Sequence, residues 1–393
     1  MNKTKAIGNS AIVLYFIIGL EIMIMISPFA GFFYSVFNPF LLETAKYPAT
    51  RWLSSFFLPH MVVPPDDFLK LIRIMGSVLF VSGMAGFLIC AVQVYANKFM
   101  KKGTALKGLY SVIRHPQYVM LSIAGAGLSI LWPRFLVPVL WLVMILLYYF
   151  LSKDEERRML KQYPDTYRVY REKTGMFLPR RIENIVIPDR SIGKLALFVL
   201  IVAVTIGGAF CLRAYTVKHL PLWTGDNIAA LAIIPDDMQK MEHRMPDILK
   251  TEKVKSRIKD NEHYLVYFLP PDYIMQGLVA DTGGDWKLYK QHHTFNMITD
   301  WIFHPFRHLT EGHHAMHGAT GHAVHTVNSG IVRRLVFLRI GGVRIDKPYD
   351  MLSINAKRTP QFMLDVEIHN LQILDIKTLP EDTGWGTVPT PVF

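Results

Sequence analysis

The chain has 393 residues, of which 51% are hydrophobic and two are cysteine. Two cysteines are too few for a disulfide framework or for a cysteine-ligated iron–sulfur cluster, which needs about four ligands. The formal net charge is +12; residues 1–213 hold 24 Lys and Arg against 11 Asp and Glu, and residues 214–393 hold 19 against 20. Because the basic excess lies among apolar stretches, it indicates the positive-inside rule of membrane proteins rather than nucleic-acid binding.

Several apolar stretches approach the length that crosses a bilayer, about 20 residues. The five spans that we expect are 11–30, 72–96, 117–133, 135–151 and 195–213. The first is not a cleaved signal peptide, because no small-residue cleavage site follows it. Residues 31–66 are too interrupted for a span, and we expect an interfacial segment with an amphipathic piece near Tyr47–Phe57.

The basic loops predict the orientation of these spans. The loop 97–114 has five basic residues and no acid, and the loop 152–194 has eleven basic residues. Both are expected in the cytoplasm. Five spans then place the N-terminus in the cytoplasm and the tail after Arg213 outside it. We therefore expect an integral protein of a bacterial inner membrane with a periplasmic C-terminal domain.

The tail is expected to fold as a mixed α/β or mostly β domain. Residues 236–260 are charged and helix-like, with a break expected at Pro246. Residues 263–280 resemble two strands around a Pro-Pro turn, and 331–340 and 362–376 are also strand-like. The Pro-, Thr- and Gly-rich end, residues 379–393, is expected to extend over the surface.

Histidine is concentrated in one part of this tail, since nine of fifteen lie between residues 292 and 325. Imidazole is the commonest metal ligand, although glycines interrupt the helix that would align the rings. Two interpretations stay open: histidines scattered over a polar loop, and a metal or haem site. The candidate ligands are His304, His308, His313, His314, His317, His322 and His325.

Two polar clusters flank an apolar hairpin in the membrane half. Arg114-His115-Pro116-x-Tyr118 opens the hairpin, Glu155-Glu156 ends it, and Tyr167-x-x-Tyr170 follows. Two short crossings place both clusters on one side of the bilayer, and costly polar groups at membrane depth indicate a functional site. In order and hairpin length, these motifs resemble the isoprenylcysteine carboxyl methyltransferase and phospholipid methyltransferase superfamily. The resemblance covers roughly residues 75–190.

The resemblance implies an integral membrane enzyme that uses S-adenosylmethionine. This chain departs from the family pattern at two places. Met120 stands where a small residue is usual and could crowd the cofactor, and Tyr163-Pro164 replaces the usual Phe-Gly. The expected organisation has four parts. An N-terminal transmembrane helix with an interfacial segment (1–70) is followed by a methyltransferase-like membrane core with a cytoplasmic site (71–194). A last transmembrane helix (195–213) then leads to an extracytoplasmic His-rich domain (214–393).

Methyl transfer from a sulfonium requires in-line positioning and a site that holds a cation. Carboxylates and aromatic faces suit that cation, and a helix that begins at proline leaves backbone N–H groups for a carboxylate. The residues expected to bind the cofactor are Tyr110, Arg114, His115, Pro116, Tyr118, Glu155 and Glu156. The residues expected to orient the substrate or accept its proton are Arg158, Tyr167, Tyr170 and Arg171.

Simpler interpretations exist for each group. The arginines can be positive-inside anchors, the tyrosines an interfacial belt, and the two glutamates a solvated start of a helix. The first functional hypothesis is a methyltransferase that acts on a lipid-like or lipidated substrate from the membrane. The alternative is a non-catalytic membrane subunit of a larger, electron-transfer complex, whose tail docks a partner or helps to bind a metal or haem. A sterol-reductase type of enzyme would need about twice as many spans.

Overall fold

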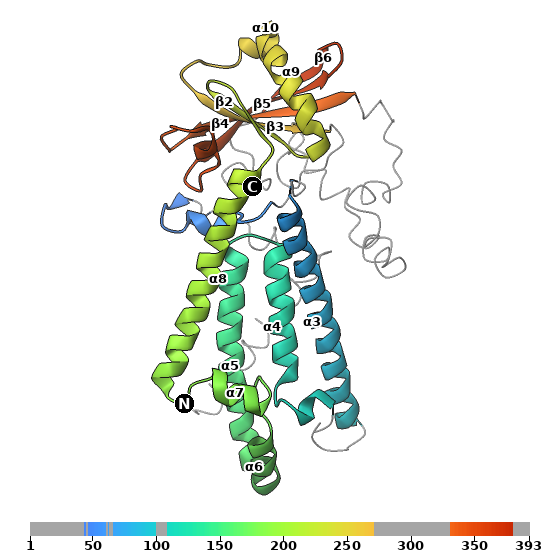
Figure 1. Cartoon of the computed structure of the whole chain (residues 1–393), viewed down its shortest axis with the longest axis vertical. Helices are drawn as coiled ribbons and strands as arrows, with labels where there is room; N and C mark the ends of the chain where they lie inside the picture. The colour runs from blue at the N-terminus through green and yellow to red at the C-terminus, as the bar shows by residue number, and fades with distance from the viewer. Residues whose placement is uncertain are drawn as a thin grey trace, which may run out of the picture. The chain divides into compact units, whose positions relative to one another are not determined.

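The computed structural model describes residues 43–44, 46–59, 62, 66–99, 108–270 and 331–379. The chain divides into a helical unit, Phe56–Leu58 with Asp66–Thr216, and a C-terminal unit that contains Val217–Phe393 together with Pro59–Pro65 and the residues up to Ser55 (Figure 1). The expected span 11–30, the second strand of 263–280, the histidines from 292 to 325 and the end of the chain after Leu379 lie outside the described residues.

Four long helices run side by side in the helical unit (Figure 1). They are α3 (Asp67–Phe99), α4 (Pro116–Leu131), α5 (Leu136–Gln162) and α8 (Ser191–His219). Two short helices, α6 (Pro164–Lys173) and α7 (Arg180–Val186), connect α5 to α8, and the 3-10 turn η3 (Gly108–Ser111) precedes α4. The expected spans 72–96, 117–133, 135–151 and 195–213 therefore correspond to helices, and Pro116 begins α4 as predicted.

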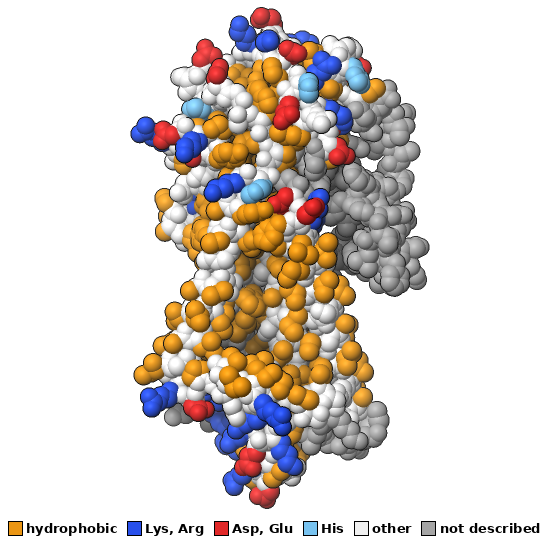
Figure 2. Space-filling view, viewed as in Figure 1, with side chains coloured by type: hydrophobic (Ala, Val, Ile, Leu, Met, Phe, Trp, Pro, Cys, Tyr) orange, Lys and Arg blue, Asp and Glu red, His pale blue; other side chains and the backbone are white. Residues whose placement is uncertain are grey.

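Three of these helices, α3, α5 and α8, are long and apolar enough to cross a membrane, whereas α4 is apolar but shorter, at 16 residues. Only 6% of the most apolar stretch of α8 is buried, so its apolar side chains face outward. Figure 2 shows hydrophobic side chains over the visible face of the helical unit and Lys and Arg at its lower end. The expected total of five spans is not confirmed by the described residues, which hold three such helices.

Glycines allow α3 and α4 to pack closely. A Cβ atom added to Gly83 would lie 2.4 Å from the backbone nitrogen of Ala124, and one added to Gly127 would lie 2.3 Å from that of Phe80. Neither backbone can retreat without moving a whole helix, so any larger side chain would push the helices apart. Small residues at helix contacts are typical of membrane bundles, where close backbone packing stabilises the association.

The C-terminal unit is built on one six-stranded sheet in the order β1-β2-β3-β4-β5-β6. The strands are β1 (Leu222–Thr224), β2 (Ile228–Ala232), β3 (His263–Leu269), β4 (Val332–Gly341), β5 (Lys357–Glu367) and β6 (Ile373–Thr378). The β2–β3 pair is parallel, and every other pair is antiparallel. Three helical segments connect β2 to β3, namely η4 (Pro235–Asp237), α9 (Met238–Lys250) and α10 (Glu252–Lys255). The domain is therefore mixed α/β.

Both faces of this sheet are buried. Alternate residues of β3 enter two apolar clusters, with Leu265 and Tyr267 in one and Val266 and Phe268 in the other. The second cluster contains Met241, Met245 and Ile248 of α9, and the first contains Met351 and Leu352 of the 3-10 helix η6 (Pro348–Leu352). The parallel pair β2 and β3 accordingly consists of nearly continuous apolar runs, as expected for strands covered on both sides.

Two expectations from the sequence need correction. The break at Pro246 is wrong, because α9 continues through this proline to Lys250, held by its buried apolar stripe. Residues 362–376 do not form one strand; β5 ends at Glu367, and a turn with Leu371 at φ 59° leads into β6. Near Tyr47–Phe57, the structure has the 3-10 helix η2 (Arg51–Ser54), and the interfacial location of this segment stays a prediction.

Candidate active site

Arg114 connects the start of α4 to both the end of α5 and the segment after α6. Its side chain is buried, and its Nε donates to Glu156 Oε1 at 2.6 Å. Its Nη1 donates to the carbonyl of Arg171 at 3.1 Å and also to that of Thr174. Its backbone nitrogen donates to Gly175 O at 2.8 Å. Arg114 therefore has a structural function, because it joins three elements at one end of the bundle.

The two glutamates of α5 have different environments. The Glu156 side chain is 7% exposed, and its charge is balanced by Arg114. The Glu155 side chain is 27% exposed, accepts a hydrogen bond from the Tyr118 hydroxyl at 2.6 Å, and lies 3.3 Å from His115 Nδ1. Successive residues of a helix point about 100° apart, so the pair presents one carboxylate to the interior and one toward an accessible site.

His115 lies between these carboxylates. Its Nε2 is 3.6 Å from Glu156 Oε1, beyond hydrogen-bond distance, and among the described residues this buried nitrogen has no hydrogen-bond partner. Burial alone would lower the pKa of His115, but the nearby negative charges of Glu155 and Glu156 outweigh burial and raise it above its usual value. The two carboxylates thus favour the protonated form of this imidazole.

A row of stacked rings continues from His115. The imidazole stacks on Tyr118 with 5.7 Å between ring centroids, and Tyr118 stacks on Tyr148 of α5 at 4.7 Å. The Tyr170 hydroxyl donates to the carbonyl of Tyr110 at 2.6 Å. Burial raises the pKa of Tyr110, Tyr167 and Tyr170 above the usual value of 10. These hydroxyls consequently stay protonated at neutral pH and act as hydrogen-bond donors.

One further residue shapes the site although no sequence motif indicated it. Glu183 of α7 accepts hydrogen bonds at its Oε2 from the backbone nitrogens of Met176 (2.5 Å), Phe177 (3.1 Å) and Leu178 (3.3 Å). The same segment provides the carbonyl of Gly175 to Arg114 and that of Met176 to the His115 backbone. Three converging N–H groups form a small anion-binding concavity, which Glu183 fills.

The remaining expected residues lie at the edge of this arrangement. Arg158 is 56% exposed and pairs with Asp154 on its own helix. Arg171 is exposed and contributes its backbone carbonyl to Arg114. The thioether of Met120 packs against α3, because a Cβ on Gly86 would lie 2.5 Å from its sulfur. Met120 therefore fills a gap between α3 and α4.

The expected metal or haem site lies in residues outside those described. Within the described ranges, no group of three or more His, Cys, Asp or Glu side chains could hold a metal ion. The candidate ligands His304, His308, His313, His314, His317, His322 and His325 belong to the segment 271–330, so their function stays a prediction.

Comparison with known proteins supports the resemblance of the core. A model of the phospholipid methyltransferase family matches residues 99–166. The comparisons with curated proteins and with solved structures gave no match. The matched segment contains α4 and α5 with Arg114, His115, Tyr118, Glu155 and Glu156. The resemblance to the isoprenylcysteine carboxyl methyltransferase and phospholipid methyltransferase superfamily is thus confirmed for this segment of the chain.

Proposed function

We propose that this protein is an integral membrane methyltransferase that uses S-adenosylmethionine and acts on a lipid-like or lipidated substrate. The observation that carries the proposal is the contact of His115 and Tyr118 with Glu155, which joins the two ends of the α4–α5 hairpin within the family-matched segment. Apolar helices on both sides of this hairpin provide a route for a substrate that arrives from the lipid.

The residues present fit S-adenosylmethionine, which supplies an electrophilic methyl group on a positively charged sulfur. Glu155 offers a carboxylate that is 27% exposed, and the hydrogen bond from the Tyr118 hydroxyl fixes the orientation of this carboxylate. The unpartnered Nε2 of His115, buried among the described residues, offers a hydrogen bond to a polar group that enters the site. Glu155, Tyr118 and His115 would therefore hold the cofactor.

Arg114 and Glu156 support Glu155, Tyr118 and His115, but they are not expected to contact the cofactor. Their ion pair is buried, with side chains 5% and 7% exposed, so neither group is available to a ligand. Because Arg114 neutralises Glu156, the net negative charge of the pair of glutamates resides on Glu155. Both residues are positioning residues, and they set the orientation of His115 between the carboxylates.

The tyrosines are poor proton acceptors. Burial raises the pKa of Tyr167 and Tyr170, which keeps both hydroxyls protonated at neutral pH. If the methyl acceptor is a carboxylate, no base is needed. If it is an amine or thiol, the carboxylate of Glu155 is the accessible group that can take the proton.

Calorimetric titration of the detergent-purified protein with S-adenosylmethionine tests the proposal. We expect saturable binding that Glu155→Gln weakens by about tenfold or more, the loss that follows when a charge-assisted contact becomes neutral. Glu172→Gln changes an exposed glutamate of α6 and should leave the affinity unchanged. Transfer of a labelled methyl group to phospholipid vesicles or to a prenylated cysteine then distinguishes the acceptors.

Failure of the unmodified protein to bind S-adenosylmethionine would overturn the proposal. That result would favour the alternative of a non-catalytic membrane subunit, in which the same polar cluster only stabilises the bundle. Equal affinities of wild type and Glu155→Gln would support binding of the cofactor but show that Glu155 does not contribute to it.

A further inference from the structure

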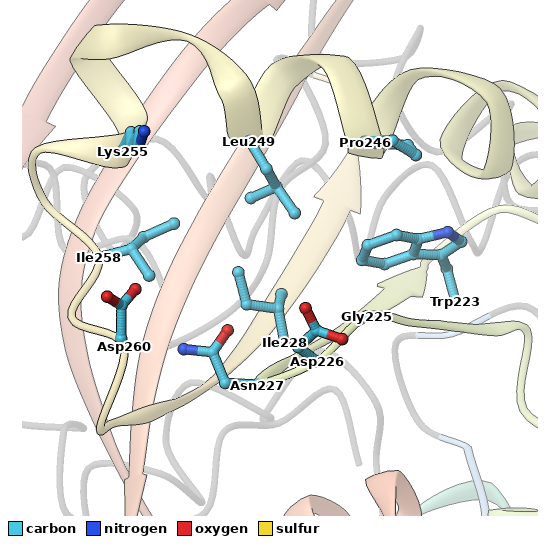
Figure 3. Close-up of a pocket in the computed structure, with 10 residues that line it drawn as sticks. All are labelled: Trp223, Gly225, Asp226, Asn227, Ile228, Pro246, Leu249, Lys255, Ile258 and Asp260. Atoms are coloured by element: carbon cyan, nitrogen blue, oxygen red, sulfur yellow. The ribbon is translucent and has the colours of Figure 1, made fainter.

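The C-terminal unit contains a pocket that is independent of the polar cluster in the helical unit. Its volume is about 290 Å³, and it lies between the β1–β2 turn and the segment that contains α9 and α10 (Figure 3). This volume is close to the lower limit for ligand pockets, which is about 300 Å³. Five apolar side chains line it: Trp223, Ile228, Pro246, Leu249 and Ile258.

The polar groups of the pocket are mainly hydrogen-bond acceptors. Asp226 and Asp260 both line it, and in the described part of the chain neither carboxylate has a hydrogen bond or an ion pair. The amide nitrogen of Asn227 donates to the carbonyls of Lys259 (3.2 Å) and Glu262 (2.8 Å). Its amide oxygen is thereby directed into the pocket, as Figure 3 shows.

The charges are distributed unequally along the pocket. Figure 3 shows Lys255 and Asp260 at one end and Asp226 beside the indole ring of Trp223 at the other. Among the described residues that line the pocket, Lys255 is the one cationic side chain, and it lies toward the end with Asp260, away from Asp226. A carboxylate beside an aromatic face and an amide oxygen is suited to an ammonium group, which donates hydrogen bonds and is attracted to the ring.

The walls around Asp226 are held in place. The backbone nitrogen of Gly225 donates to Ile228 O at 2.8 Å, which closes the turn that carries Asp226. A Cβ atom on Gly225 would lie 2.8 Å from Cη2 of Trp223, so glycine allows the indole to rest against the turn. Asn227 ties this turn to the segment 259–262. A pre-formed wall of this kind lowers the entropic cost of binding a ligand.

We propose that this pocket binds a small organic ammonium ion, with the cation between Asp226 and Trp223 and an apolar body against Ile228, Leu249 and Ile258. A hard metal ion fits poorly, because it requires six or more oxygen ligands, whereas much of this pocket is lined by apolar side chains. An anion would meet two carboxylates and a single lysine. A neutral apolar compound would leave Asp226 and the Asn227 oxygen without a donor.

Calorimetry on the full chain in a maltoside detergent tests this proposal with three matched probes, n-butylammonium, n-butanol and butyrate. We expect butylammonium to bind at least tenfold more tightly than butanol, and butyrate to bind more weakly than both. Asp226→Asn should weaken butylammonium by about tenfold, the effect of replacing one charge-assisted hydrogen bond. Butanol should bind equally to wild type and to this variant.

Asp260→Asn is the matched control, since it makes the same charge change at the end of the pocket away from Trp223. We expect it to change the butylammonium affinity by less than about threefold. Gly225→Ala should weaken butylammonium without any change of charge, because the added methyl displaces the indole. Both aspartates are exposed, so these variants are expected to fold normally, which a thermal unfolding curve checks.

The proposal is overturned if no butylammonium binding is detected up to millimolar concentration, or if the three probes bind alike. It is also overturned if Asp226→Asn and Asp260→Asn have equal effects, since the cation would then not be held beside Trp223. Binding of calcium alone, with no binding of butylammonium, would replace the proposal with a metal site.

Discussion

At the scale of single residues, the decisive feature of the helical unit is the burial of a complete ion pair. Arg114 and Glu156 are 2.6 Å apart and almost fully buried, with side chains from two different elements. Removing one partner of such a pair leaves an uncompensated charge, which costs about 3 kcal/mol or more of stability. The pair therefore stabilises the folded core that holds His115 and Glu155, independently of any ligand.

Arg114→Met is accordingly expected to destabilise the protein strongly. Glu156 would remain buried without its partner, and the carbonyl of Thr174 would lose a donor. We expect a loss of about 3 kcal/mol, measured as a fall in melting temperature of the detergent-purified protein. Arg158→Met is the control, because Arg158 is 56% exposed and pairs on the surface with Asp154, where such pairs contribute at most about 1 kcal/mol. Similar melting temperatures for the two variants would contradict the prediction.

The environment of His115 predicts a dependence on pH. Burial lowers the pKa of His115, but the opposite effect of Glu155 and Glu156 is larger. The folded-state pKa therefore lies above the unfolded value of 6.5. Protonated His115 therefore stabilises the fold below pH 6.5, and this contribution is lost as the pH rises through the folded-state pKa. We expect the melting temperature to fall over that range, and Glu155→Gln to reduce the fall. His243→Gln, which changes an exposed histidine of α9, should leave the profile unchanged.

At the scale of elements, the sequence predicts what depends on local pattern. Continuous apolar runs predicted the long helices, and the proline at position 116 predicted the start of α4. The role of Glu183 was missed, because it accepts hydrogen bonds from backbone N–H groups of the loop 174–178, an arrangement that no side-chain motif encodes. The effect of Pro246 was misjudged for a related reason, since contacts of Met241 and Met245 with the sheet outweigh one missing backbone donor.

The loop 174–178 gives a test of this kind of contact. Glu183→Ala removes the acceptor of three backbone N–H groups, so the amides of Met176, Phe177 and Leu178 should exchange hydrogen faster. Because this loop also holds Arg114 and His115, we expect weaker binding of S-adenosylmethionine as well. Glu172→Ala changes an exposed glutamate of α6 and serves as the control. Unchanged exchange at these three amides would show that Glu183 does not order the loop.

At the scale of the whole molecule, the charge distribution agrees with the way the helices connect. One end of the helical unit carries Ile113 bridged to Gly175, together with the basic residues of α6 and α7. The opposite end carries Asp66, whose carboxylate accepts a hydrogen bond from the Tyr215 hydroxyl at 2.5 Å. The start of α3 and the end of α8 are thus at the same end of this unit.

This arrangement supports the orientation that the sequence predicts, because the positive-inside rule assigns the end with Lys and Arg to the cytoplasm. Residues 152–194 contain eleven basic residues, whereas Asp66 and Asp67 begin α3 at the other end. On this assignment, the chain after α8 is expected to lie outside the cytoplasm. The orientation stays a prediction from the basic residues of these loops. The number of spans could not be predicted from apolar length alone, since α4 has only 16 residues.

The orientation is testable with paired reporters fused after Phe393. Alkaline phosphatase is active only outside the cytoplasm. Green fluorescent protein fluoresces when it stays in the cytoplasm and does not fluoresce when it is exported in the unfolded state. We expect phosphatase activity and no fluorescence, because α8 carries the chain away from the basic end. Fusions at Lys161, which lies at the end of α5 within the basic region, should give the reverse pattern. A fluorescent C-terminal fusion, with an inactive phosphatase, would invert the proposed topology and place the ammonium pocket of the C-terminal unit in the cytoplasm.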